Sequence, residues 1–190
     1  MGGADKGDPR SDLIQMSVLR SNTVRFSGAI MADAKRFILT SSAITEREQP
    51  FSHPWNPTSR LIGVQLGRAL GLKRTGVSIA RIPPGKESFV YHSHQHEEEW
   101  LYILSGRGIA EIDEEEIEVH AGDFMAFPTP SVAHHLKNPF DQHLVYLMGG
   151  ENREMEIADF PKLGRRMLRN GESIEIYDTS DAKPFGPLGT

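Results

Sequence analysis

Between residues 61 and 148 the sequence consists of short apolar runs that are separated by turn signals. The turns are rich in glycine, proline, asparagine and aspartate, and they lie at residues 83–85, 105–106, 113–115, 121–123 and 138–139. The runs between them are too short for ordinary helices. We therefore predict strands at residues 64–66, 77–82, 88–94, 99–104, 108–112, 117–120, 124–127, 134–137 and 143–148. Short strands at this spacing are typical of an all-β sandwich or barrel.

The sequence before this region has a different character. Residues 13–39 alternate short apolar and polar pieces, which predicts short strands or a loosely packed arm. Residues 46–57 hold three prolines and therefore cannot form an ordinary helix or a central strand. We expect an extended connector there, with Phe51 and Trp55 as anchors on the main domain.

The C-terminal region carries a hairpin signal. Asn170-Gly171 separates two short apolar segments, at residues 166–169 and 173–177, and favours a two-residue turn. Residues 152–160 are expected to be a short helix or irregular. The whole chain is thus predicted to have three parts. They are an N-terminal arm with a Pro-rich connector (1–58), a barrel (59–150) and a C-terminal hairpin extension that packs on the barrel (151–190).

Composition excludes several classes of function. The net charge of −5 provides no basic surface for nucleic acid and no polybasic patch for a membrane. No apolar run approaches the roughly 18 residues of a transmembrane helix, and the N-terminus lacks the apolar core of a signal peptide. The chain has no cysteine, which removes disulfides, zinc–thiolate sites and cysteine nucleophiles together. We expect a cytoplasmic protein in which His and carboxylate side chains hold any metal.

Three side chains within residues 85–106 have a spacing suited to metal binding. His92 and His94 lie two residues apart, so in an extended strand their imidazoles point to the same face, about 6.6 Å apart along the chain. Glu99 begins the next apolar run after a polar break. If the chain turns back at this break, the carboxylate joins the two imidazoles. Two nitrogens and one oxygen that converge on a point indicate a metal site.

A pair of histidines follows a rigid, Pro-containing loop at residues 128–133. Adjacent residues of a strand face opposite sides, so only one of His134 and His135 can point into a barrel. His134 is the better candidate because Leu136 shares its face. His135 is then expected to face outward.

The first of these stretches resembles a motif of the cupin superfamily of small β-barrels. That motif is written G-x5-H-x-H-x3,4-E-x6-G. Gly85, His92, His94, Glu99 and Gly106 match it, with one additional residue in the spacer after Gly85.

The second stretch resembles the second cupin motif, G-x5-P-x-G-x2-H-x3-N. Gly122, Pro128, His134 and Asn138 match it. Pro130 stands where the motif has glycine, and His134 arrives one residue later than in the motif. Both departures lie in the loop before the ligand strand, so they concern the shape of the loop more than the ligand.

The resemblance covers about residues 76–150 and implies a double-stranded β-helix, or jelly-roll, barrel. It further implies that His92, His94, Glu99 and His134 hold one divalent transition-metal ion. The remaining histidines of this region do not correspond to ligand positions; they are His96, His120, His135 and His143. Three imidazoles and a carboxylate suit Fe, Mn, Ni, Co, Cu or Zn and do not choose among them. The alternative is a barrel without metal whose histidines satisfy one another.

Several other side chains are expected at the surface or in packing roles. Glu111 and residues 113–116 are interpreted as an exposed acidic hairpin, and residues 96–98 as a solvated polar stretch at the mouth of the barrel. Tyr91 is expected to pack against the arm, the tail or a partner subunit.

Two kinds of function fit this pattern. One is a metalloenzyme of dioxygenase, isomerase or lyase type that acts on a small oxygenated metabolite such as a hydroxy-acid, a diol or sugar, or a diketone. The other is a non-catalytic module that binds a metal or a small ligand. The ligand set leaves coordination positions open on most candidate ions, which favours the enzyme. A DNA-binding regulator is disfavoured because the chain is acidic and has no helix-turn-helix pattern. The resemblance also implies a homodimer.

Overall fold

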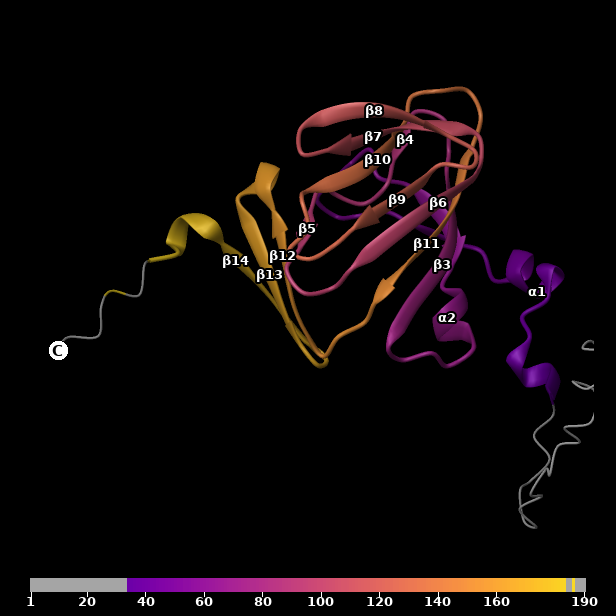
Figure 1. Ribbon diagram of the computed structural model, residues 1–190, viewed down its shortest axis with the longest axis horizontal. Coiled ribbons are helices and arrows are strands. Elements are labelled where there is room, and N and C mark those ends of the chain that lie inside the picture. Colours follow the sequence, from indigo (N-terminus) through magenta and orange to yellow (C-terminus); the bar gives the residue numbers. More distant parts are fainter. Residues whose placement is uncertain (1–33, 184–185, 187–190) are drawn as a thin grey trace, which may run out of the picture. The chain divides into compact units, whose positions relative to one another are not determined.

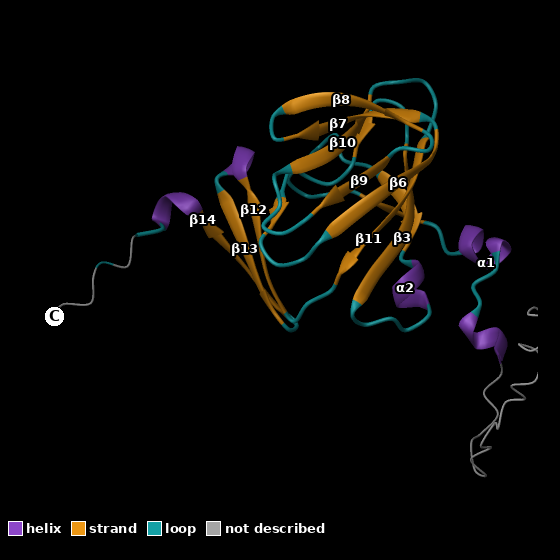
Figure 2. Ribbon diagram, in the orientation of Figure 1, coloured by secondary structure: helices purple, strands orange, loops and turns teal. Residues whose placement is uncertain are grey.

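The computed structural model of the chain describes residues 34–183 and residue 186. Within these residues the strands form three antiparallel sheets (Figures 1 and 2). The first sheet has the order β1 (Gln49–Phe51), β2 (Leu61–Val64), β3 (Thr75–Ile82), β11 (Leu144–Glu151), β6 (Glu99–Ser105), β9 (Phe124–Phe127). The second has the order β4 (Lys86–Glu87), β10 (His134–Asn138), β7 (Arg107–Ile112), β8 (Glu115–His120). The third has the order β14 (Ser173–Asp178), β13 (Arg165–Asn170), β12 (Met155–Phe160), β5 (Ser93–His94).

The helices of the described residues are short. They are α1 (Ser41–Glu46), α2 (Leu66–Ala69) and the 3-10 helices η1 (Ala34–Phe37), η2 (Pro161–Leu163) and η3 (Thr179–Asp181). None of them is long and apolar enough to cross a membrane.

Strands that are distant in sequence are neighbours in the sheets. Strand β11 lies between β3 and β6, and β10 pairs with β7 (Figure 1). The inward side chains of the first two sheets form one apolar core, composed of Leu61, Ala80, Ile82, Leu101, Ile103, Ala110, Val119, Phe127, Leu136, Leu144 and Tyr146. This arrangement is a jelly-roll barrel and confirms the predicted all-β fold.

Alternation along β10 decides which side chains enter the barrel. Leu136 belongs to the core and is paired with Ala110 of β7. His134 lies two residues before Leu136 and therefore shares its inward face, whereas His135 faces away from the core.

Three local predictions were wrong. The strand expected at residues 64–66 ends at Val64, and α2 begins at Leu66. The strand expected at residues 88–94 is reduced to Ser93–His94, with Lys86–Glu87 paired separately before it. Residues 155–160 form β12 rather than a helix or an irregular segment. In the last two cases pairing with a distant strand decides the outcome, and a local pattern does not contain that information.

The two ends of the described chain are fixed by different contacts. The predicted hairpin around Asn170-Gly171 is confirmed as β13–β14, which joins the barrel through β12 and β5. Phe51 packs 5.2 Å from Phe89, and Trp55 meets Phe160 edge-on at 5.2 Å between ring centroids, so both predicted anchors are confirmed. Of the arm expected at residues 13–39, residues up to 33 lie outside the described part; η1 covers Ala34–Phe37, and residues 38–39 lie in no helix or strand. The division into three domains stays a prediction.

Candidate metal centre

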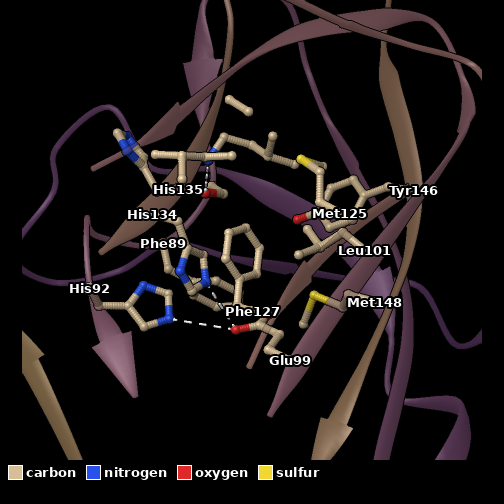
Figure 3. Close-up of a pocket in the computed structure, with 14 residues that line it drawn as sticks. Phe89, His92, Glu99, Leu101, Met125, Phe127, His134, His135, Tyr146 and Met148 are labelled. Carbon is tan, nitrogen blue, oxygen red and sulfur yellow. Dashed lines mark hydrogen bonds and ion pairs between the residues drawn. The ribbon is translucent and has the colours of Figure 1, made fainter. Parts of the chain in front are cut away.

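Three imidazoles surround the carboxylate of Glu99 at one end of the barrel. The Nε2 atoms of His92, His94 and His134 lie 3.9, 3.4 and 3.3 Å from Glu99 Oε2. Potential ligand atoms of His92, His94 and Glu99 all lie within 4.8 Å of one another; His134 is outside this group of three and joins it through Glu99. Figure 3 shows the rings of His92 and His134 turned toward the Glu99 carboxylate. The structure thus brings together the four side chains that the sequence singled out.

Backbone pairing places these side chains. His92 and His134 form an antiparallel bridge, with N–H···O distances of 3.2 and 2.8 Å in the two directions. Glu99 is the first residue of β6, which ends before Gly106. Gly106 has φ of 78°, and a Cβ atom there would lie 2.2 Å from the carbonyl oxygen of His143, so only glycine fits this turn.

Each of the three imidazoles has an acceptor at Nδ1. His92 Nδ1 lies 2.7 Å from the carbonyl oxygen of Val90, and His134 Nδ1 lies 3.0 Å from that of Val132. His94 Nδ1 lies 3.3 Å from a carboxylate oxygen of Glu156. Because these oxygens accept hydrogen bonds only, Nδ1 of each ring carries a hydrogen. Nε2 of each ring faces Glu99. It donates to the carboxylate when the ring is protonated and is free to bind a metal ion when the ring is neutral.

The electrostatics of this cluster keep Glu99 charged. Burial opposes the charge, but hydrogen bonding with His134 and His94 outweighs it and holds the pKa of Glu99 well below its usual range. Burial lowers the pKa of His92 to about 4, so this ring is neutral at pH 7. Burial also disfavours a charge on His94, but Glu99 and Glu156 outweigh it and raise its pKa.

The donor set fits a divalent cation. Three neutral imidazoles and a carboxylate oxygen direct their lone pairs at one region, and a divalent cation there would take the place of the protons that otherwise join His94 and His134 to Glu99. Aromatic contacts hold the rings: Phe127 stacks on His134 with centroids 3.6 Å apart, and Phe160 stacks on His92 at 6.3 Å.

Behind the imidazoles lies a small cavity within the barrel (Figure 3). Its volume of about 20 Å³ leaves room for about one water molecule. Its walls are mostly apolar and include Phe89, Leu101, Met125, Phe127 and Met148. The hydroxyl of Tyr146 points into it (Figure 3), and burial together with the charge of Glu99 raises the pKa of this hydroxyl. Tyr146 therefore presents a neutral hydrogen-bond donor.

In front of the imidazoles, a wider cavity of about 230 Å³ opens toward solvent. It is lined by His92, His94 and Glu99, and at its rim by three acidic residues, Glu97, Glu98 and Glu151. Glu97 was expected to be solvated, which is wrong: it is buried and paired with Arg169 of β13. The C-terminal hairpin covers Glu97, and the sequence analysis did not predict this contact.

Sequence reasoning missed Glu156. This residue of β12 is fully buried, and its carboxylate accepts hydrogen bonds from the amides of Gln95 and His96 as well as contacting His94. The one available signal was alternation in residues 155–160. That pattern is ambiguous because each of the two faces carries both apolar residues and an acid.

On the outer face of β10, His135 belongs to a second cluster of charged side chains, which we call the outer cluster. Its members are Glu87, Glu111, His135, Lys137 and Lys162. His135 Nε2 lies 3.4 Å from Glu87, and its Nδ1 lies 3.3 Å from Glu111. Glu111 also pairs with Lys137 at 2.9 Å and with Lys162.

Two predictions about this face need correction. His135 does point away from the core, but it is buried rather than exposed, because Tyr91 and Lys162 cover it. Glu111 was expected in an exposed hairpin, yet it is 5% exposed. The rest of that hairpin, residues 113–116, is exposed as predicted.

Comparisons with known proteins agree with this architecture. The family model of the cupin domain matches residues 78–150. An uncharacterised protein of Methanocaldococcus jannaschii is 37% identical over 68 residues, which are 36% of this chain and 52% of that protein. This chain thus matches about half the length of that curated relative.

Solved structures extend the match beyond the cupin domain. A provisionally named sugar phosphate isomerase from Acidithiobacillus ferrooxidans is 32% identical, with a TM-score of 0.76 over 80% of this chain and 97% of that one. A sugar phosphate isomerase of the cupin superfamily from Silicibacter pomeroyi has 21% identity and a TM-score of 0.64, over 73% and 92% of the two chains. A predicted oxalate decarboxylase from Thermotoga maritima has 22% identity and a TM-score of 0.53, over 61% and 99%. The last two are similar in fold alone. Given the barrel, its two motifs and these relatives, the chain belongs to the cupin superfamily.

Proposed function

We propose that this chain is a metalloenzyme that binds one divalent transition-metal ion through His92, His94, Glu99 and His134. The observation that carries the proposal is the convergence of three Nε2 atoms on one oxygen of Glu99, at 3.3 to 3.9 Å. When bound, the ion supplies Lewis-acid or redox chemistry to a small oxygenated ligand, such as a hydroxy-acid, a diol or sugar, or a diketone. Its identity among Fe, Mn, Ni, Co, Cu and Zn is open.

The remaining pocket residues suit such a ligand. The walls of the inner cavity are mostly apolar, and Phe89 and Met148 line both it and the outer cavity. Tyr146 offers a neutral donor to an oxygen of the ligand, and its raised pKa keeps its proton in place at pH 7. The larger outer cavity gives room for the rest of a small metabolite.

Isomerisation of a sugar phosphate is a second candidate, suggested by the relative with 32% identity. One observation favours it. A groove of about 810 Å³ adjoins the outer cavity and shares Gly76, Ser78, Glu97 and Glu151 with it. Its cations are Arg68, Lys73 and Arg169, of which Arg169 pairs with Glu97. Cations beside the mouth are what a phosphate ester requires.

Elemental analysis of the purified protein, followed by a substrate screen, tests the proposal. We expect close to one transition-metal ion per chain, lost in His134→Ala. The screen covers hydroxy-acids, diols, sugars, diketones and sugar phosphates, with oxygen uptake recorded. Turnover that disappears in His134→Ala supports an enzyme, and turnover confined to phosphate esters selects the isomerase. A fully loaded protein that converts none of them supports the alternative, a non-catalytic binding module.

We also propose a homodimer that pairs through the outer face of the first sheet. Tyr102, Leu104 and Phe124 are exposed there by 40%, 42% and 61%. Tyr102 lies opposite Phe124 on one side and Leu147 on the other, so the apolar surface continues across three strands. Such patches mark association sites. Sedimentation is expected to give the mass of two chains, and a monomeric mass in dilute solution would refute this pairing. Cytoplasmic location stays a prediction.

A further inference from the structure

Glu156 lies outside the part of the chain that defines the family. The cupin model matches residues 78–150, and Glu156 follows six residues later in β12. Strand β12 pairs with β5, and this pairing places Ala158 opposite His94. Because alternate residues share a face, Glu156, Ala158 and Phe160 form one side of β12, and all three are buried. Glu156 is the charged member of this otherwise apolar face.

The Glu156 carboxylate is fixed from three directions. The amide of Gln95 donates to it at 3.0 Å, the amide of His96 at 3.2 Å, and His94 Nδ1 lies 3.3 Å away. A fully buried carboxylate is costly unless such donors surround it. A neutral acceptor would satisfy the two amides. A charge contributes most to the contacts with imidazoles, which are His94 Nδ1 at 3.3 Å and, farther away, His96 Nδ1 at 3.7 Å.

The three imidazoles of the centre are oriented in two different ways. His92 and His134 each donate from Nδ1 to the carbonyl two residues earlier, that of Val90 or Val132. For His94 the corresponding carbonyl is that of His92, and it already accepts the amide of His134 at 2.8 Å. His94 thus receives its Nδ1 acceptor from β12 instead.

We propose that Glu156 is a positioning residue of the metal centre, which holds the His94 ring with Nε2 toward the ion. This inference rests on the metal binding proposed above and adds that the C-terminal sheet takes part in it. A carboxylate that accepts from Nδ1–H fixes the tautomer and ring angle of a ligating imidazole and makes its other nitrogen a better ligand. Loss of such a partner typically weakens metal binding about 10- to 100-fold.

The test measures Co(II) affinity of the full chain by competition with a chromophoric chelator. Glu156→Gln is expected to bind Co(II) about 10- to 100-fold more weakly than the wild type and to shift the visible Co(II) absorption bands. The matched control is Asp159→Asn. Asp159 lies on the same strand and accepts from Gln95 and Arg166, but it contacts none of the four ligands. Its affinity and spectrum are expected to stay unchanged.

A double-mutant cycle separates positioning from a general effect on the fold. If Glu156 acts through His94, Glu156→Gln causes no further loss of affinity in a His94→Ala background. An equal loss in both backgrounds would overturn the inference. So would wild-type affinity in Glu156→Gln, even if the thermal stability of the metal-free protein falls. Should Glu156→Gln fail to fold, Glu156→Asp retains the charge but withdraws it from the ring, and it is expected to weaken Co(II) binding as well.

The same titration distinguishes this inference from the proposed function. If the wild type binds Co(II) and His134→Ala does not, the metal centre stands whatever Glu156 does. If the wild type fails to bind Co(II), the metal centre itself is refuted, and the role of Glu156 is refuted with it.

Discussion

His134 and His135 are neighbours in sequence, but they belong to clusters of opposite electrostatic character on the two faces of β10. On the inner face, His134 joins two further imidazoles around the carboxylate of Glu99. On the outer face, His135 lies between Glu87 and Glu111, and Lys137 and Lys162 both pair with Glu111.

This contrast teaches that His and carboxylate residues in contact do not by themselves indicate a metal site. The outer cluster already contains its cations, as two lysine ammonium groups. Among the described residues, no lysine or arginine forms an ion pair with the inner cluster, and the Nδ1 hydrogens of its rings bond to Val90, Val132 and Glu156. The proposed metal ion would therefore be the cation of the inner cluster, whereas the outer cluster contains its own. The following predictions test that distinction.

The largest expected effect is on metal affinity. His134→Ala removes a ligand and is expected to weaken Co(II) or Ni(II) binding by more than about 100-fold. That is a larger loss than removal of a supporting partner causes. His135→Asn removes the imidazole from the other face of the same strand and is expected to leave metal affinity unchanged. Isothermal titration of both variants checks this pair. Equal losses in the two variants would break the distinction between the faces.

A smaller effect, on stability, is expected in the outer cluster. Glu111→Gln leaves Lys137 and Lys162 without their buried carboxylate and is expected to lower the free energy of unfolding by about 1–3 kcal/mol. The lower part of that range is favoured because Lys162 is half exposed. Glu116→Gln removes the exposed partner of the same Lys137, and its effect is expected to be below about 1 kcal/mol. Urea unfolding of metal-free protein measures both, and metal affinity is expected to stay at the wild-type level in each.

The stability provided by Glu111 is expected to depend on pH. Burial opposes its charge, but Lys162 and Lys137 outweigh it and lower its pKa below the ordinary value. When the pKa of a carboxyl group is lower in the folded than in the unfolded state, its charge stabilises the fold. This contribution is complete above the unfolded pKa, about 4.3, and is lost as the pH falls through the folded pKa. The difference in unfolding free energy between wild type and Glu111→Gln should be constant from about pH 7 to pH 5 and shrink below that. A difference that grows on acidification would contradict the assigned charges.

The smallest effect is expected at Tyr91, which covers the outer cluster. Its hydroxyl accepts a hydrogen bond from the amide of Glu114 at 3.0 Å, and Lys162 Nζ lies 4.4 Å from the ring centroid. Tyr91→Phe retains the ring and removes only the hydrogen bond, so a loss of about 1 kcal/mol is expected. Tyr102→Phe, on the exposed face of β6, is expected to change stability by less than about 0.5 kcal/mol. Thermal unfolding compares the two.

The ligand residues show which parts of the site could be predicted from the sequence. The spacing of His92, His94 and Glu99 predicted the inner cluster, because strand alternation and a local turn depend on residues that are close together in the chain. His134 was chosen over His135 by the same alternation, and its distance to Glu99 agrees with that choice.

Burial, in contrast, was misjudged wherever a distant segment covers the site. Glu97, Glu111 and His135 were all expected to be exposed, and all three are buried under residues 162–169 or Tyr91. Glu156 was missed for a related reason. Its role depends on β12 pairing with β5, which lies some 60 residues away in sequence.

The sequence by itself determined the all-β class, the turns and which side chains alternate toward one face, because these follow from contacts between residues close together in the chain. Only the tertiary structure decided that the C-terminal sheet closes against β5 and supplies Glu156 to His94. The physical reason is that pairing of distant strands depends on the summed fit of two surfaces, and no short window of sequence contains both of them.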